Sequence, residues 1–288
     1  MSLMNLLILV IIAVSLSLPG IFLVLRNMAM ISDALSHTVL LGIVLGYLLV
    51  RNLHSPLLIL TAALIGVLTV FCIEFLSAHK LVKSDSATGV VFPLFFSLGV
   101  IILSLYLRNV HIDLDCVIMG DITFADLDLI KIWGYKIPWA LFYGIIILLV
   151  NSIFILVFFK ELKLASFDPE TFVLTGFSST LINYGLITLI SLSSVVSFNI
   201  VGAILVIAFL VIPPSTALLV TKHLHNTIFL SIIITVCNSV IGYLLSIELN
   251  VNSAGMCAVV SGVVFLITLT GKQLIAHLRT KSQARSRA

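Results

Sequence analysis

Nine apolar stretches, each close to the length of a membrane-spanning helix, dominate the 288-residue sequence. A helix needs about 20 apolar residues to cross the hydrocarbon core of a bilayer. Only 9% of the residues are charged, against about 25% in a soluble domain. The stretches lie at residues 3–25, 34–50, 56–78, 88–107, 137–159, 177–197, 200–220, 227–247 and 254–271. The sequence therefore predicts an all-α, polytopic membrane protein with eight or nine transmembrane helices.

These spans leave little chain for anything else. We predict a single transmembrane domain over residues 1–271, followed by a basic cytoplasmic tail over residues 272–288. The sequence has no GxxxxGK[ST] phosphate-binding loop, so any ATP must be hydrolysed by another chain. It also lacks the HExxH and GxSxG motifs of hydrolases. We therefore expect no enzyme of these classes; the family resemblance described below implies a transport subunit instead.

The distribution of lysine and arginine predicts the orientation, because these residues are enriched in cytoplasmic loops. With nine alternating spans and a cytoplasmic C-terminus, eleven of the fifteen lie inside and four lie outside. This favours an external N-terminus. Eight spans are the alternative, if one of the two runs separated by Ser197-Phe198-Asn199 does not cross. The acid-free basic tail is typical of a topology anchor, and we expect no nucleic-acid partner.

Ionisable residues within spans mark functional sites more often than other residues do. Asp33 and His37 are four residues apart at the start of the second stretch, so they share one face of a helix. A carboxylate and an imidazole are common ligands of Mn²⁺, Zn²⁺ and Fe²⁺. The pair supplies two ligands, and a complete site needs more from another helix, water or a second subunit. The alternative is structural: Asp33 caps the helix and His37 is its hydrogen-bonded neighbour.

Two longer loops stand out among the short connections. The outer loop contains five acids, which form either a solvated connection or a vestibule that attracts cations; they are Asp113, Asp115, Asp121, Asp126 and Asp128. In the inner loop, Asp168 precedes Pro169, which predicts a helix N-cap followed by proline at the first helical position. The short surface helix predicted there is either a connector or a docking element for a soluble partner.

Other polar residues carry less information. Glu74, late in the third stretch, is expected to reach the cytoplasmic interface. His223 and His225 are two residues apart and are interpreted as loop residues in a tight inner turn. Pro213 and Pro214 indicate either a kinked helix that lines a pathway or close packing of small residues.

Several segments, in order and at similar spacing, resemble one family: the membrane permeases of ATP-binding-cassette importers for manganese, zinc and iron. Each segment alone is a weak signal, but together they extend over most of the chain. They are Asp33–His37 with Gly42, Lys83–Phe92, Asp113–Ile122, Phe167–Glu170, Val201–Val206, Ile212–Ala217 and Asn252–Gly255. One departure is that Ser215 and Thr216 follow the prolines where the family usually has alanines.

This resemblance implies a type II importer permease fold in a bacterial plasma (inner) membrane, surrounded by lipid. The implied partners are a second permease subunit, a dimer of cytoplasmic ATPases and an extracytoplasmic metal-binding protein. The second permease is either a copy of this chain or a related one, and Asp113–Ile122 resembles one member of a heterodimeric pair.

The resemblance also implies residue roles. Asp33 and His37 would contact the transported divalent metal (manganese, zinc or iron), and no permanently bound cofactor is expected. The ATPase-coupling helix would include Phe167, Asp168, Pro169, Glu170 and Gly176. The rival hypothesis from the residues alone is an ion-coupled secondary transporter of a cation, which could use an intramembrane Asp and His for proton linkage.

Overall fold

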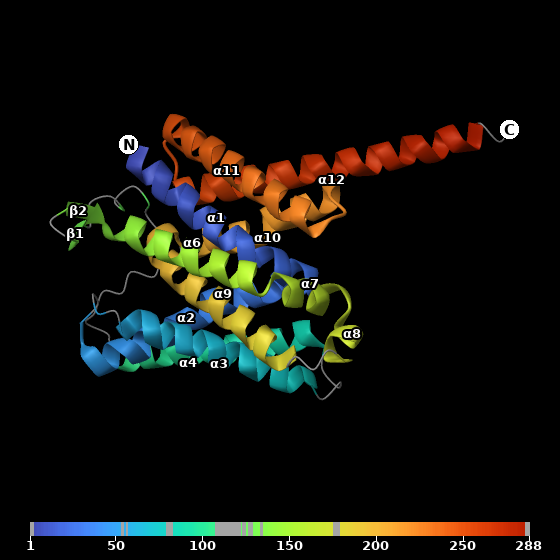
Figure 1. The fold of residues 1–288 in the computed structure, drawn as a ribbon. Coiled ribbons are helices and arrows are strands. Elements are labelled where there is room, and N and C mark those ends of the chain that lie inside the picture. The colour runs from blue at the N-terminus through green and yellow to red at the C-terminus, as the bar shows by residue number, and fades with distance from the viewer. Residues whose placement is uncertain are drawn as a thin grey trace.

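The computed structural model describes residues 3–52, 55, 57–78, 83–106, 122, 125, 129–132, 135–174 and 179–285. Helices account for most of this part of the chain (Figure 1). They are α1 (Leu3–Leu25), α2 (Ala29–Val50), α3 (Leu57–Ala78), α4 (Ser84–Tyr106), α6 (Trp139–Val157), α7 (Phe159–Phe167), α8 (Pro169–Leu174), α9 (Ser179–Val201), α10 (Ala203–Val220), α11 (Leu224–Leu249) and α12 (Ser253–Arg285).

A short hairpin interrupts the helical pattern on the side opposite α7 and α8 (Figure 1). Strand β1 (Leu129–Ile132) pairs antiparallel with β2 (Tyr135–Pro138). The sequence pattern did not predict these strands. They lie in the predicted outer loop, and α6 begins directly after β2.

Helix α1 lies at the centre of the molecule and packs against α6, α9, α10 and α11. Helices α2, α3 and α4 form a group on one side of α1, and α11 and α12 lie on the other (Figure 1). The α1 side chains Ile8, Leu9, Leu16 and Phe22 are fully buried. An apolar helix that is buried on nearly all sides is typical of the interior of a membrane bundle.

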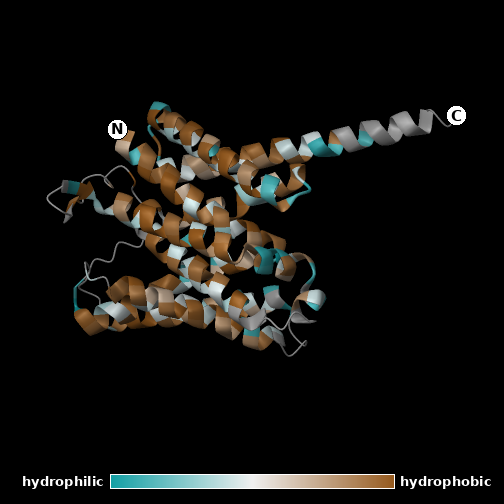
Figure 2. Cartoon of the chain, viewed as in Figure 1, coloured by the Kyte–Doolittle hydropathy of each residue, from teal (hydrophilic) through white to brown (hydrophobic). Residues whose placement is uncertain are grey.

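The outer surface of the bundle is apolar, as a lipid environment requires. Figure 2 shows brown, hydrophobic ribbon along the body of the helices, and teal mainly at their ends and midway along α12. Within the described part of the chain, eight helices are long and apolar enough to span a membrane. The ninth, α9, has 23 residues, which gives a length of about 34 Å. Its segment Ile182–Phe198 is also apolar.

The boundary between α9 and α10 differs from the expected break at Ser197-Phe198-Asn199. Helix α9 continues to Val201, and the break lies at Gly202, whose φ is 82° and ψ is 159°. This region of backbone space is essentially open only to glycine. Hydropathy therefore placed the break a few residues early, because it does not detect a backbone conformation.

Prolines within the spans leave backbone carbonyls without their helical donors, and neighbouring helices compensate. Pro19 has no N–H, so the carbonyl of Ser15 lacks its partner four residues later. Asn151 of α6 supplies the missing donor, with its Nδ2 2.6 Å from the Ser15 oxygen, and Ser193 of α9 donates to Asn151 Oδ1 at 3.1 Å. Satisfying a freed carbonyl in this way is what allows proline inside a membrane helix.

Pro214 similarly removes the helical donor for the carbonyl of Leu210 in α10. That carbonyl faces Gly20 of α1 so closely that a Cβ at position 20 would overlap the Leu210 oxygen. The backbones of α1 and α10 therefore meet at a point where only glycine fits. Pro213 and Pro214 are both buried at this contact, which supports the close-packing interpretation of the two prolines.

We expect Gly20→Ala to lower the thermal unfolding midpoint of the purified protein in detergent. The added methyl group collides with a backbone oxygen, and overpacking of this kind destabilises by about 1–3 kcal/mol. Gly262→Ala is the control, because a Cβ there meets nothing within 4 Å. Equal midpoints for the two variants would contradict the close approach of α1 and α10.

Candidate functional site

The candidate metal-binding residues lie near the beginning of α2, directly after a tight turn from α1. The turn consists of Arg26, Asn27 and Met28. Asn27 adopts a left-handed conformation with φ of 56°, and Met28 N–H donates to the Leu23 carbonyl at 3.0 Å. These features are typical of a Schellman motif, which ends a helix rigidly. The position of α2 is therefore tied closely to the end of α1.

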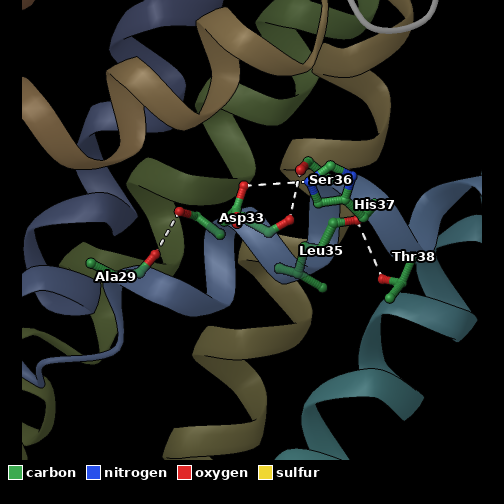
Figure 3. A network of polar contacts seen from close by, with 7 residues as sticks. Ala29, Asp33, Leu35, Ser36, His37 and Thr38 are labelled. Carbon is green, nitrogen blue, oxygen red and sulfur yellow. Dashed lines mark hydrogen bonds and ion pairs between the residues drawn. The ribbon is translucent and has the colours of Figure 1, made fainter. Parts of the chain in front are cut away.

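Asp33 and His37 are both inside α2 and point to the same side of it (Figure 3). The His37 Nε2 atom is 3.6 Å from Asp33 Oδ1. The N-cap residue of α2 is Met28, which makes no side-chain capping hydrogen bond. The alternative in which Asp33 is the helix cap is therefore wrong.

Aromatic rings of α4 hold the imidazole in place. The His37 ring stacks on Phe92 with centroids 5.4 Å apart, and Phe96 approaches it edge-on at 5.6 Å. Between the two polar residues along the helix, Ala34 is fully buried against Ile73 and Val91. Packing on α3 and α4 thus fixes the rotation of α2 and orients His37.

The pair is not buried within this chain, since both side chains are 43% exposed. Ionisable residues in membrane helices usually face a bundle interior, a water-filled cavity or a polar partner. The described residues contain no group of three or more His, Cys, Asp or Glu side chains that could hold a metal ion. The chain therefore offers two adjacent donors at its surface, not a closed site.

The predicted inner helix is present as two short helices, α7 and α8, at the same end of the bundle as the α1–α2 turn (Figure 1). Asp168 joins them and caps α8, with the Thr171 N–H donating to Asp168 Oδ1 at 3.0 Å. Hydrogen bonds from the Thr171 side chain and backbone lower the pKa of the Asp168 carboxyl. Phe167 is 58% exposed at this corner and Glu170 is exposed as well. Gly176 lies outside the described residues.

Other residues singled out in the sequence have different outcomes. The five acids of the outer loop lie outside the described residues. His225 is not in a loop: it lies in the first turn of α11 and stacks on Phe159 of α7 at 4.5 Å. His223 is the N-cap residue of α11.

The side chain of Glu74 is half-buried and lies next to residues of other helices. Its carboxylate lies near Arg26 and contacts Tyr184 of α9. The contacts of Arg26 with α7 and α9 were not predicted from the sequence. No spacing pattern connects residues so far apart in the chain, and the only available signal was a cation at the end of a span.

The lowered pKa of Asp168 predicts a pH dependence confined to the α7–α8 corner. Because the folded pKa lies below the ordinary value of 3.8, the cap stabilises α8 fully above that value. The stabilisation is lost as the pH falls through the folded pKa. Hydrogen exchange of the α8 amides should therefore accelerate in this range in the parent protein. In Asp168→Asn, which keeps a capping side chain without the charge, this acceleration should be absent.

Asp168→Ala provides the second comparison, since it removes the cap altogether. We expect fast exchange of the α8 amides already at neutral pH. Exchange rates unchanged in Asp168→Ala would show that the cap does not hold α8.

Comparisons with known proteins place the arrangement in context. The model of the ABC 3 transport family matches residues 2–272. The zinc transport system membrane protein TroD of Treponema pallidum (strain Nichols) is 42% identical over 261 residues, which cover 91% of this chain and 71% of the relative. The manganese transport system membrane protein MntD of Bacillus subtilis (strain 168) is 40% identical over 284 residues, with 97% and 96% covered.

Among solved structures, PsaBC from Streptococcus pneumoniae in complex with Fab has a similar fold. The TM-score is 0.76 at 27% sequence identity, and the match covers 92% of this chain and 89% of the PsaBC chain. The helical arrangement described above is therefore also found in an experimentally determined protein.

Proposed function

Because this chain belongs to the ABC 3 transport family, we propose that it is the permease subunit of an ATP-driven importer for a divalent transition metal. The fold is that of an ABC permease, and the protein is a multi-pass membrane protein. Relatives that match over most of the chain are named as zinc and manganese transport proteins. The single observation that carries the proposal is the Asp33–His37 pair, half-exposed on one face of α2.

The separation of the two donor atoms suits a shared metal ion. Zinc lies about 2.0–2.2 Å from imidazole nitrogen and carboxylate oxygen in protein sites. Two donors at such distances and a tetrahedral angle are roughly 3.4 Å apart, close to the 3.6 Å between His37 Nε2 and Asp33 Oδ1. The helix therefore presents the donors nearly in the positions that chelation requires. Manganese, zinc and iron are all compatible with this ligand pair.

Two donors hold an ion weakly, which suits a transported ion that must also leave. The further ligands would come from the second permease subunit, because the pair is exposed at the surface of this one. That subunit is either a second copy, which would contribute its own Asp33 and His37, or a related permease. In either case the ion would pass between the two subunits.

The energy would come from partner subunits. The chain has no phosphate-binding loop of its own, and the α7–α8 corner presents the exposed Phe167 and Glu170 at the proposed cytoplasmic end. An ATPase dimer would bind at this corner, with Asp168 and Pro169 forming the start of α8. On the opposite side of a bacterial plasma membrane, an extracytoplasmic metal-binding protein would deliver the ion.

The metal-binding role is tested by Asp33→Asn and His37→Gln in the complete importer. Each change removes a ligand while retaining a polar side chain of similar size, and we expect Mn²⁺ and Zn²⁺ uptake to fall at least tenfold, in line with the usual cost of weakening a metal site. Glu248→Gln, at the other end of the bundle on α11, is the control and should leave uptake unchanged. Full uptake by both ligand variants at matched expression would refute the proposed site.

The dependence on ATP needs a separate measurement. We expect proteoliposomes that contain this chain with its ATPase and binding protein to accumulate Mn²⁺ only when ATP is supplied. The chain alone, given a proton gradient, should not accumulate the ion. Accumulation by the chain alone would instead identify a secondary transporter.

A further inference from the structure

Arg26, the first residue after α1, connects three helices at the inner end of the bundle. Its Nε donates to Ser166 Oγ of α7 at 3.2 Å, and its Nη1 donates to Asn183 Oδ1 of α9. The Ser166 hydroxyl in turn donates to the Leu162 carbonyl at 2.7 Å, which fixes its orientation. One guanidinium thus uses two separate nitrogens to join α7 and α9 to the end of α1.

The electrostatic surroundings of Arg26 extend this contact to α3. Arg26 is half-buried, and burial lowers its pKa while the nearby Glu74 carboxylate of α3 raises it. Glu74 also contacts Tyr184, the neighbour of Asn183. Among the described residues, Nη2 of Arg26 is buried without a hydrogen-bond partner.

The position of Arg26 in the chain links the same cluster to the metal-binding pair. Only Asn27 and Met28 separate it from α2, and hydrogen bonds hold this turn rigidly. Asp33 follows seven residues after Arg26, and His37 follows one helical turn later. On the other side, Ser166 is two residues before Asp168, the cap of α8. Arg26 therefore stands between the α7–α8 corner and the helix that carries Asp33 and His37.

We infer that Arg26 is the positioning residue that transmits movement of the α7–α8 corner to α2, and so changes the placement of Asp33 and His37. This inference rests on the proposed function, in which an ATPase binds the corner. A displacement of α7 would pull on the guanidinium through Ser166. The rigid α1–α2 turn would carry that displacement into α2, while Asn183 would carry it into α9, which packs against α2 and α3.

The inference is tested on the complete importer in proteoliposomes, with Mn²⁺ as the probe. The readout is the amount of Mn²⁺ imported per ATP hydrolysed. We expect Arg26→Lys to lower this ratio at least fivefold while ATP hydrolysis and the thermal unfolding midpoint stay close to the parent values. A lysine keeps the charge, but its single amine cannot replace two nitrogens that bind separate acceptors.

Arg51→Lys is the matched control. Arg51 also follows directly on the last residue of a helix, in this case α2, but it lies at the other end of the bundle and is exposed. We expect its ratio to equal that of the parent. An equal loss in both arginine variants would overturn the inference.

Two changes to the acceptor Asn183 test the same contact without altering Arg26: one removes the acceptor and the other retains it. Asn183→Leu should lower the ratio about as much as Arg26→Lys, whereas Asn183→Asp, which retains an acceptor for the guanidinium, should preserve it. The double variant Arg26→Lys, Asn183→Leu should be no worse than either single change, because the two residues act through one contact. Should Arg26→Lys fail to assemble, the two Asn183 variants and Ser166→Ala decide the outcome.

A merely structural role would give a different pattern. It would lower the unfolding midpoint and the amount of assembled complex, but the Mn²⁺ imported per ATP by the assembled fraction would stay constant. That result would overturn the inference while leaving the proposed function intact, since Asp33→Asn would still lower import at least tenfold. Failure of the proposed function is distinct, because Asp33→Asn and His37→Gln would then import Mn²⁺ normally.

Discussion

Side-chain oxygen and nitrogen atoms inside a membrane helix are stable only where they meet water, ions or other polar groups. Asp33 and His37 are half-exposed at the surface of this chain. Their polar atoms therefore find only some of the polar neighbours they need within the isolated subunit. The α4 aromatic rings and the buried Ala34 hold the pair in one orientation. A second permease subunit and a passing metal ion would together satisfy the remaining polar atoms.

The rest of the bundle combines close backbone packing at its centre with a cluster of polar contacts next to the α1–α2 turn. At the centre, Asn151 satisfies the carbonyl that Pro19 frees, and Gly20 allows the α1 and α10 backbones to meet. Next to the α1–α2 turn, Arg26 joins the end of α1 to α7 and α9.

Much of the architecture follows from hydropathy. The apolar runs predicted eight or nine spans, and eight helices of the described residues are long and apolar enough to cross a membrane. The Asp168-Pro169 pair correctly predicted the start of α8, because capping depends on adjacent residues. The boundary at Gly202 was placed early, since a positive φ leaves no trace in hydropathy.

The site could be predicted only in part. The spacing of Asp33 and His37 placed them on one helix face, and the structure brings them together. Their aromatic neighbours Phe92 and Phe96 come from a separate helix, and no periodicity within one span reveals such a contact. The contacts of Arg26 with its acceptors on α7 and α9 could not be predicted either, because they depend on how segments that are distant in the sequence pack together.

Pulsed electron paramagnetic resonance of Mn²⁺ bound to the complete importer tests the central claim most directly. If His37 contacts the transported ion, the spectrum of the parent complex will contain modulation from a coordinated imidazole nitrogen. This modulation will disappear in His37→Gln and persist in the His225→Gln control. Nitrogen modulation that is unchanged in His37→Gln, or absent from the parent complex, would contradict the assignment of this residue as a metal ligand.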